Sequence, residues 1–521
     1  MAARYWVPGG TGNTNSTSNW STSSGGASGA SVPVSTDDAI FDANSGSGTA
    51  TVNATLSVLS LNLTGFTGTL AGSSTIQIYA GGVNLGSTAT LTHTGNLSAL
   101  ATSTSWTSNG MQWKGNVSIS GSFSVTYTDN WDVLGNYSNS STSNPIGSTI
   151  TVRGNMTVNA FGGTSTTNFI LAGTGSWSIT ADAGQSDYTV AATGNYIVTT
   201  ILAFTGTNKI FTLVPGGTLN AATGGISTSG SNTFDLLNTS FNTLTFTGTA
   251  TMTFNSPLTC TGTMILGSLG QVLSLNGSTL YVAGNLTIGG TSSQVSGTTV
   301  IETTGTGVFS STQTTGYFGC SINFNNGANT LTISGTIRYR TGTMTVLSGT
   351  FITAGSTLVL VTTCTLNTAG IVWNNVTVAN GTITNNSLLT VTGTLAYALG
   401  STVIFSGTAG WTAATFDIQT SSNVNHVLKS GLTYTITTNF ISIATTNANK
   451  DTIKSDTPGV QAILTLNQGA NQSVGYTNAT DIDSSLGQAI YVANGTLSNA
   501  TNWNPLTATD MGGGGSLIFV N

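Results

Sequence analysis

Apolar and polar positions alternate along this chain in short stretches that each follow a Gly-Asn step or a close variant of it. The glycine of the step recurs at intervals of 20, 20, 19, 21 and 19 residues, at Gly95, Gly115, Gly135, Gly154, Gly175 and Gly194. Two residues after each glycine stands a large apolar or aromatic residue: Leu97, Val117, Tyr137, Met156, Trp177 and Tyr196. The residue after that one is Ser or Thr, with Ile197 as the exception. This alternation predicts a turn followed by a short strand whose apolar column points inward.

A unit of about 20 residues with two or three short strands cannot bury its apolar face alone, whereas stacked units close a continuous core. We therefore predict an all-β fold, a single-stranded parallel β-solenoid (right-handed β-helix) with coils of about 20 residues. Over residues from about 50 to about 480 this gives roughly 21 coils. A string of antiparallel sandwiches is the alternative, with turn signals every about 8 to 12 residues. The fixed columns favour the solenoid. Glycine and β-branched residues dominate, so no long helix is expected.

We expect three parts: an N-terminal cap over residues 1–48, the solenoid body over 49–480 and a C-terminal cap over 481–521. Caps are expected because the open edges of a solenoid would otherwise add further strands. The stretch from Tyr5 to Trp20 is echoed by the stretch from Tyr491 to Trp503, which suggests related small β caps. Near the end, Gly512–Gly515 and Leu517–Val520 are interpreted as a hinge and a final strand.

Charged residues make up only 5% of the 521 residues, against roughly 25% in an ordinary soluble domain. Stacking explains the deficit, because a charged position would repeat as a like-charge ladder about 4.8 Å apart, whereas Asn, Ser and Thr form hydrogen-bonded ladders. Residues 341–416 contain no Asp, Glu, Lys, Arg or His, and residues 258–457 contain no proline, which could not donate to a neighbouring coil.

The same composition argues against several functions. Nine basic residues and a net charge of -6 cannot neutralise many phosphates, so we expect no nucleic-acid partner. Two histidines and few carboxylates make acid–base catalysis a poor fit, and we expect no enzymatic activity. No apolar run is long enough to span a membrane, and the N-terminus lacks the apolar stretch of a signal peptide, so we expect synthesis in a cytoplasm without export.

The three cysteines, Cys260, Cys320 and Cys364, form neither a disulfide framework nor a metal-type pair, and we expect buried free thiols.

The densest acidic group is Asp37, Asp38 and Asp42. Three carboxylates within six residues are a candidate cation site, in which a structural Ca²⁺ would also take backbone carbonyls; otherwise we expect no cofactor. The alternative is that these residues cap turns by accepting backbone N–H bonds. Asp481 and Asp483 form a second pair with the same two interpretations.

Aromatic residues gather between positions 106 and 137. Flat rings on the side of a solenoid could stack against sugars, which makes four of them candidate glycan-binding residues: Trp106, Trp113, Tyr127 and Trp131. The alternative is that they fill the core. Tyr137, which follows them, already belongs to the inward column.

Two pairs of carboxylates, Asp129 with Asp132 and Asp182 with Asp187, leave a glycosidase open, since that chemistry needs two carboxylates about 5 to 9.5 Å apart. Their alternative is a set of solvated turn residues. His93 and His426 have no neighbouring partner in the sequence and receive no catalytic role.

The opening segment contains an ordered series of short motifs. They are Arg4-Tyr5-Trp6-Val7, Gly9-Gly10-Thr11-Gly12, Asn19-Trp20-Ser21, Gly25-Gly26-Ala27, Ser31-Val32-Pro33, Asp37-Asp38 and Phe41-Asp42-Ala43-Asn44. This series resembles the N-terminal motif of large Gly/Ser/Thr/Asn-rich structural proteins, tail fibres or virion surface proteins, of tailed bacteriophages and related mobile elements. Pro8 departs from the usual direct Val-Gly-Gly step. The resemblance covers the first 45 residues or so and implies a virion component with a β-helical body.

We therefore expect a non-enzymatic virion structural protein: a fibre, spike or surface appendage, homo-oligomeric, that contacts other virion proteins and the host surface or its glycans. Residues 1–48 would attach it to the particle. Three alternatives stay open: a capsid-decorating protein, a tailspike depolymerase and a bacterial β-helix adhesin. The absence of a signal peptide argues against the last.

Overall fold

The computed structural model describes residues 1–7, 9–120, 124–140, 145–159, 161, 166–247, 251–267, 272–275, 279–289, 294–311, 317–353, 355–397, 402–418, 425–443 and 450–506. Two compact units are present, residues 1–261 and residues 262–521, and each is described by itself.

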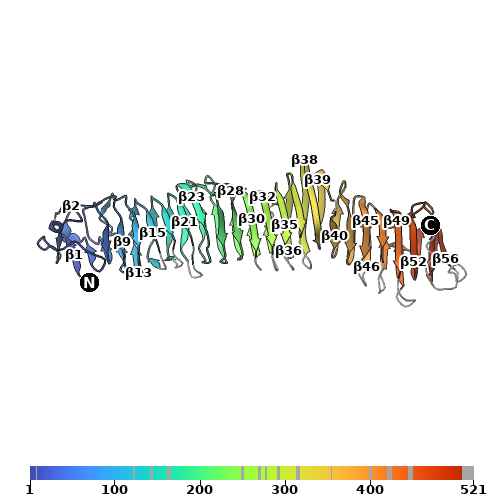
Figure 1. Cartoon of the computed structure of the whole chain (residues 1–521), viewed down its shortest axis with the longest axis horizontal. Coiled ribbons are helices and arrows are strands. Elements are labelled where there is room, and N and C mark those ends of the chain that lie inside the picture. Colours follow the sequence, from blue (N-terminus) through green and yellow to red (C-terminus); the bar gives the residue numbers. More distant parts are fainter. Residues whose placement is uncertain are drawn as a thin grey trace. The chain divides into compact units, whose positions relative to one another are not determined.

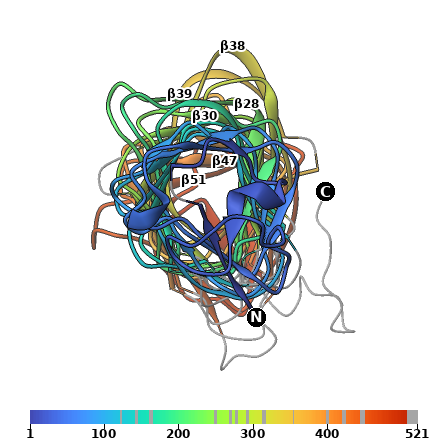
Figure 2. The same cartoon turned by 90° about the vertical axis from the view of Figure 1, so that its left-hand side faces the viewer.

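The fold is the predicted parallel β-solenoid. Each coil contains about 21 residues, close to the expected length of about 20, and the stacked coils form about 19 turns. The described residues form 56 strands and two short 3-10 helices, η1 (Thr17–Asn19) and η2 (Ala43–Ser45). Within each unit, successive coils lie side by side in sequence order (Figure 1). In unit 1 they wrap around a common interior (Figure 2).

The early coils of unit 1 have three short strands each, and each strand pairs in parallel with its equivalent one coil away. One ladder consists of β4 (Asp38–Ile40), β7 (Ser60–Asn62), β10 (Val83–Asn84), β13 (Ser103–Thr107), β16 (Val125–Tyr127) and β19 (Pro145–Gly147). A second consists of β2 (Gly12–Asn13), β5 (Thr49–Val52), β8 (Thr69–Gly72) and β11 (Thr90–Leu91). A third consists of β6 (Leu56–Val58), β9 (Ile76–Ile78), β12 (Leu97–Ala99), β15 (Val117–Ile119), β18 (Tyr137–Asn139) and β21 (Met156–Val158).

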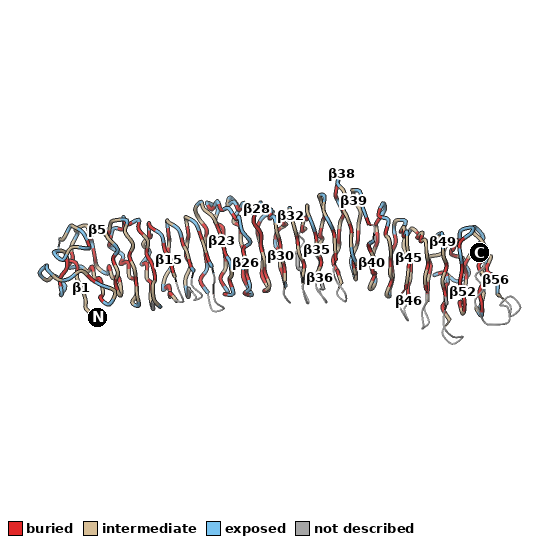
Figure 3. Tube along the Cα trace, in the orientation of Figure 1, coloured by how far each residue is buried: buried red, intermediate tan, exposed pale blue. Residues whose placement is uncertain are grey.

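The third ladder contains the apolar column predicted from the sequence. Leu97 lies opposite Val117, Val117 opposite Tyr137, and Tyr137 opposite Met156. Met156 in turn lies opposite Trp177, and all of these side chains are buried. Buried and less buried residues alternate along the strands (Figure 3), as expected where successive side chains point to opposite sides of the coil.

The last member of the predicted column is wrong by two residues. Tyr196 in β25 (Asn195–Ile197) lies opposite Gly175 instead of Trp177. The reason is that β23 (Thr174–Ile179) is longer than the earlier strands, so its first half pairs with β25 and its second half with β21. Tyr196 is nevertheless buried, and its hydroxyl donates to the carbonyl of Val152 at 2.8 Å.

The later coils of unit 1 continue the interior as a stack of aromatic rings. Equivalent positions are taken by Phe169, Tyr188, Phe211, Phe234 and Phe254, on β22 (Asn168–Leu171), β24 (Tyr188–Val190), β27 (Lys209–Leu213), β29 (Asn232–Asp235) and β31 (Thr251–Phe254). Their neighbouring ring centroids are 4.9 to 5.7 Å apart and the rings are nearly parallel. Stacked coils with matching aromatic positions thus give a column of offset-stacked rings.

Unit 2 repeats the same construction with longer strands, such as β38 (Tyr317–Tyr339), β39 (Thr343–Ile352), β45 (Leu389–Tyr397), β47 (Trp411–Asp417) and β49 (Thr433–Ile443). The interior of its later coils contains Trp411, Phe416 and Tyr434, all fully buried. The three cysteines are buried thiols that form no disulfide bond with one another, as predicted.

Residues 1–48 are both a cap and the first coil. β1 (Ala3–Trp6) pairs in parallel with β4 and antiparallel with β3 (Trp20–Ser21), so that β3 covers the outer edge of β1. The rings of Trp6, Trp20 and Phe41 pack within 5.5 Å of one another below this edge. Because β2 pairs with β5, the stack runs through the expected boundary at residue 48.

In the described part of residues 481–521 the strands pair in parallel, as they do in the coils before it. β54 (Ile490–Ala493) pairs in parallel with β56 (Trp503–Leu506), and β53 (Thr477–Asp483) with β55 (Leu497–Thr501). The sequence echo between the ends therefore corresponds to different pairings, antiparallel near Trp20 and parallel near Trp503. Pro8, Gly512–Gly515 and Leu517–Val520 lie outside the described residues.

Candidate functional site

The four aromatic residues predicted to bind glycan lie in the core, so that prediction is corrected. Trp106, Trp113, Tyr127 and Trp131 are at most 2% exposed. Each stands at an inward position of its strand, and the ring of Trp131 packs 5.6 Å from Trp106 and 5.8 Å from Tyr127. The indole nitrogen of Trp131 donates to the carbonyl of Trp106, which satisfies its polar end inside the coil. No face of these rings is available to a sugar.

The three aspartates of the candidate cation site bind separate partners. Asp37 accepts hydrogen bonds from the backbone N–H groups of Ala2 and Val34, at 3.1 and 3.4 Å. Asp38 accepts one from the Ser60 hydroxyl at 2.5 Å. Asp42 caps η2, where its Oδ1 atom accepts the N–H groups of residues 44 and 45. Asp37 and Asp42 thus accept backbone N–H groups, as the alternative interpretation predicted, whereas Asp38 accepts a side-chain hydroxyl.

No group of three or more His, Cys, Asp or Glu side chains in the described ranges is arranged to hold a metal ion. The second acidic pair has capping roles as well. Asp481 accepts hydrogen bonds from the Asn499 side chain at 2.6 Å and the Gly459 N–H at 3.0 Å, and the bond from Asn499 lowers its pKa. Asp483 accepts the N–H of Ser485 at 2.8 Å.

The first pair of candidate glycosidase carboxylates is divided between two hydrogen-bonding networks. Asp129 accepts the backbone N–H groups of Ser108 and Asn109 in the preceding coil, at 2.7 and 2.6 Å. Asp132 forms a two-point ion pair with Arg153 in the following coil, at 2.8 and 2.9 Å. The hydrogen bond that the Arg153 guanidinium donates to Asp132 raises the pKa of Arg153. These contacts favour a coil-linking role for both carboxylates.

The second pair is separated by the wall of the coil. Asp182 is fully buried and forms an ion pair with Lys209 at 2.6 Å. Asp187 is partly exposed and accepts the N–H of Ile210 on the outer side at 2.8 Å. Sequence reasoning missed Lys209, although its strand gives a signal. Lys209 lies two and four residues before the buried Phe211 and Leu213, so all three side chains point to the same face of the strand.

The two histidines are buried in the core. His93 packs 5.3 Å from Trp113, and burial lowers its pKa. The ring of His426 lies 4.3 Å from Tyr397 and 5.8 Å from Phe416, edge-on to both. Neither ring nitrogen of His426 has a hydrogen-bond partner within the part of the chain that the structure describes. Burial lowers its pKa to about 3.

The surface feature that repeats is a shallow groove between two outward columns of polar side chains. One such groove, of about 390 Å³, runs along β12, β15, β18 and β21. Its walls are an asparagine column, Asn96, Asn116, Asn136 and Asn155, and a hydroxyl column that includes Ser118, Ser138 and Thr157. The side-chain oxygen of each asparagine from Asn116 to Asn155 accepts the N–H of the equivalent residue in the next coil at 2.8 Å. This is the neutral ladder that the composition predicted.

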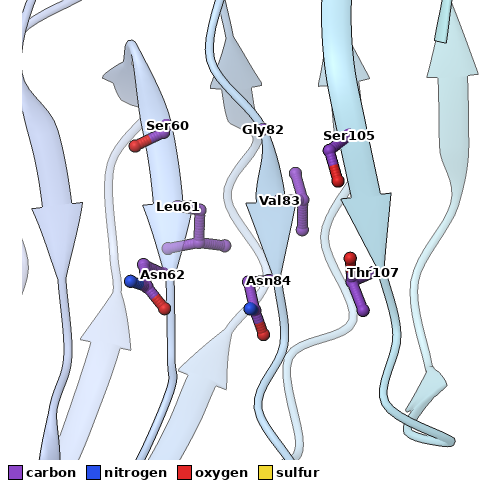
Figure 4. Close-up of a pocket in the computed structure, with 8 residues that line it drawn as sticks. All are labelled: Ser60, Leu61, Asn62, Gly82, Val83, Asn84, Ser105 and Thr107. Carbon is purple, nitrogen blue, oxygen red and sulfur yellow. The ribbon is translucent and has the colours of Figure 1, made fainter. Parts of the chain in front are cut away.

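Two further grooves of unit 1 have the same construction. One, of about 230 Å³, lies across β7, β10 and β13. In Figure 4, Asn62, Asn84 and Thr107 form one row of this groove, and Ser60, Gly82 and Ser105 form the other. The other, of about 310 Å³, is lined by Asn208, Ile210, Ser231, Asn232, Thr233, Thr251 and Thr253. The exposed faces of the coils thus present rows of uncharged hydrogen-bonding groups with one-coil spacing.

No helix among the described residues is long and apolar enough to cross a membrane. Comparison of the chain with protein-family models, with curated proteins and with solved structures finds no match.

Proposed function

We propose that this chain is a non-enzymatic structural protein of a tailed-bacteriophage particle, a β-helical fibre, spike or surface appendage. The observation that carries the proposal is the ordered series of motifs between Arg4 and Asn44, which resembles the N-terminal motif of virion proteins of this kind. The β-solenoid that follows is the type of body that the resemblance implies. A neutral surface with few charges is compatible with long-lived exposure outside a cell.

The contacts of the candidate catalytic residues support the non-enzymatic part of the proposal. Asp129 and Asp132 are held by backbone N–H groups and by Arg153, respectively. Asp182 is buried against Lys209, away from Asp187. A glycosidase needs two carboxylates that face one another across a substrate, and these carboxylates face other partners.

The groove along the asparagine column is the surface that we propose for contact with host glycans. Its side-chain amides and hydroxyls are uncharged and are the kind of groups that hydrogen-bond to sugar hydroxyls. The ladder uses the side-chain oxygens of Asn116, Asn136 and Asn155. The same side chains also carry amide N–H donors, which are spaced one coil apart along the groove.

Imaging of particles tests the proposed location. A tagged version of the chain, expressed during infection, should be incorporated into purified particles and be visible by electron microscopy with a gold-labelled antibody. Label on the tail or at a vertex would support a fibre or spike, and a high copy number over the shell would support the capsid-decorating alternative. Particles without label would contradict the virion role.

A binding experiment tests the groove. Purified chain should bind host lipopolysaccharide or capsule without releasing oligosaccharide, and Ser118→Tyr with Ser138→Tyr should fill the groove and abolish binding. Thr126→Tyr, at a partly exposed position of β16 outside the groove, is the matched control and should bind normally. Release of oligosaccharide would favour the depolymerase alternative, and unchanged binding of the double variant would exclude this groove.

A further inference from the structure

Asp182 and Lys209 form an ion pair in the core of unit 1. Both side chains are 0% exposed, and the Lys209 Nζ atom lies 2.6 Å from the Asp182 Oδ2 atom. Asp182 stands between Phe161 and Phe204, which occupy the equivalent positions one coil on either side. Lys209 occupies the inward position at the start of β27. An aspartate at a position that contains phenylalanine in both neighbouring coils, paired with a fully buried lysine, requires a specific explanation.

The hydrogen bonds around the carboxyl group are arranged as in a site for acyl transfer. The Gly184 N–H donates to the Oδ1 atom at 2.8 Å, and the Tyr188 hydroxyl donates to the Oδ2 atom at 2.6 Å. Lys209 Nζ also donates to the Gly184 carbonyl at 2.6 Å, which orients the amine. Each carboxyl oxygen therefore has a donor. The Lys209 amine contacts Oδ2, which is the oxygen that would be lost as water if the amine and the carboxyl group condensed.

We propose that Asp182 and Lys209 condense to an isopeptide bond that links two successive coils of the solenoid. In water this reaction does not proceed, because the amine is protonated and the carboxylate is a poor electrophile. A dry, apolar interior disfavours both charges, so that transfer of one proton from nitrogen to oxygen gives a neutral amine beside a neutral carboxylic acid. Burial also lowers the pKa of Lys209, against the opposing effect of Asp182.

The step balances without a further reactant. The Nζ lone pair attacks the carboxyl carbon, and the negative charge that develops on Oδ1 is stabilised by the Gly184 N–H. The C–Oδ2 bond then breaks, and Oδ2 leaves as water with one proton from the acid and one from the amine. Tyr188, hydrogen-bonded to Oδ2, assists the departure. The products are one amide and one water molecule, and no electron is transferred.

A bond between these residues would close a covalent ring over residues 182–209. This ring spans about one coil, because the pair joins positions 27 residues apart. The ring would hold neighbouring coils together at the aromatic stack even if their backbone hydrogen bonds opened.

Mass spectrometry of the purified full chain tests the proposal. A protease that cleaves after aromatic residues cuts at Tyr188, Tyr196 and Phe204, between the two partners. We expect the fragment with Asp182 and the fragment with Lys209 to remain joined, with a combined mass lower by one water molecule. Trypsin should fail to cleave after Lys209. Separate fragments of unmodified mass, with normal cleavage after Lys209, would overturn the proposal.

The chain contains its own control. Lys429 and Asp456 form an ion pair of the same residue types at 2.9 Å, but both side chains are partly exposed. Trypsin should cleave after Lys429, and no joined fragment should contain it. Lys209→Met removes the nucleophile and fits the apolar surroundings, so this variant should show no mass deficit. A water-sized deficit that persists in Lys209→Met would place the modification elsewhere and overturn the assignment.

Discussion

Single residues in this protein satisfy the backbone mostly with neutral groups, and several of the few charges are paired with an opposite charge from the next coil. The Asn116 and Asn136 side chains each accept an N–H from the next coil. The ion pairs Asp132–Arg153, Asp182–Lys209 and Lys429–Asp456 each connect positions 21 to 27 residues apart, which is about one coil. A charge is therefore tolerated where the next coil supplies its counter-charge.

Acid should destabilise the fold through His426. Its pKa is lowered to about 3 by burial, so the folded chain keeps the ring neutral while the unfolded chain takes up a proton below about pH 6.5. The unfolded state then binds more protons, and the free energy of unfolding should fall by about 1.4 kcal/mol per pH unit between these values. His93, whose pKa is also lowered, adds an effect of the same sign.

Denaturant unfolding at pH 7, 5 and 4 measures this slope. His426→Leu should flatten it and leave the part due to His93 and, near pH 4, the part due to Asp456 and Asp481, whose pKa values are also lowered. An equally steep decline in His426→Leu would show that other groups cause the acid sensitivity.

The inward column can be tested at Val117, which is 1% exposed. Val117→Asp would bury a charge without a partner, and we expect a loss of more than about 3 kcal/mol in unfolding free energy or failure to fold. Ser118→Asp, at the adjacent outward position, should cost only about 1 kcal/mol for its lost hydrogen bonds. Thermal unfolding followed by circular dichroism compares the two, and equal stability would refute the register.

At the scale of the element, a strand of this protein is stable only as part of a ladder. The strands of the early coils are short, for example three residues in β15 and β18, and their hydrogen bonds are made to the coils on either side. A charged residue has little effect on stability at a single position, but it becomes destabilising when every coil repeats it. This is the physical basis of the charge deficit.

The asparagine column tests that explanation. Asn116→Asp, Asn136→Asp and Asn155→Asp should each be tolerated singly, because a carboxylate can accept the same N–H bond. Together they place like charges about 4.8 Å apart, with a repulsion of about 1 kcal/mol per neighbouring pair in a water-like dielectric.

The melting temperature of the triple variant should therefore fall by more than the sum of the three single effects. Salt near 1 M, where the Debye length is about 3 Å, should restore most of the difference. An additive effect that salt does not change would contradict the role of like-charge ladders.

At the scale of the whole molecule, stacking creates open ends that must be covered. β3 lies antiparallel on the edge of β1, and Trp6, Trp20 and Phe41 fill the space below it. The same residues belong to the motif on which the proposed virion role rests. The segment that covers the end of the stack is therefore also the one to which we assign attachment in the proposed virion role.

Deletion of residues 1–37 should expose the edge of β4, which β1 covers in the full chain. An open parallel edge is a template for further strands, so the truncated chain should form larger species than the full chain, increasing with concentration. Light scattering coupled to gel filtration measures this. Equal size of the two chains at all concentrations would show that the segment does not protect the edge.

The sequence alone was sufficient for the solenoid, the coil length and the inward column from Leu97 to Trp177, because stacking forces chemically equivalent residues into equivalent positions and this leaves a period. The alternation of inward and outward positions along a strand also indicates buried residues such as Lys209. The register at Tyr196 could not be predicted, since it depends on the unusual length of β23.

Only the tertiary structure decided which side of the wall each functional candidate occupies. Trp106 and Trp131 were candidates for a surface, but inward strand positions and their neighbours' rings place them in the core. The partnership of Asp182 with Lys209 also depends on the stacking of coils 27 residues apart. A repeat in the sequence shows which residues every coil shares. A site arises where one coil differs from the next, and the contacts of the differing residue depend on which residues the stacking places beside it.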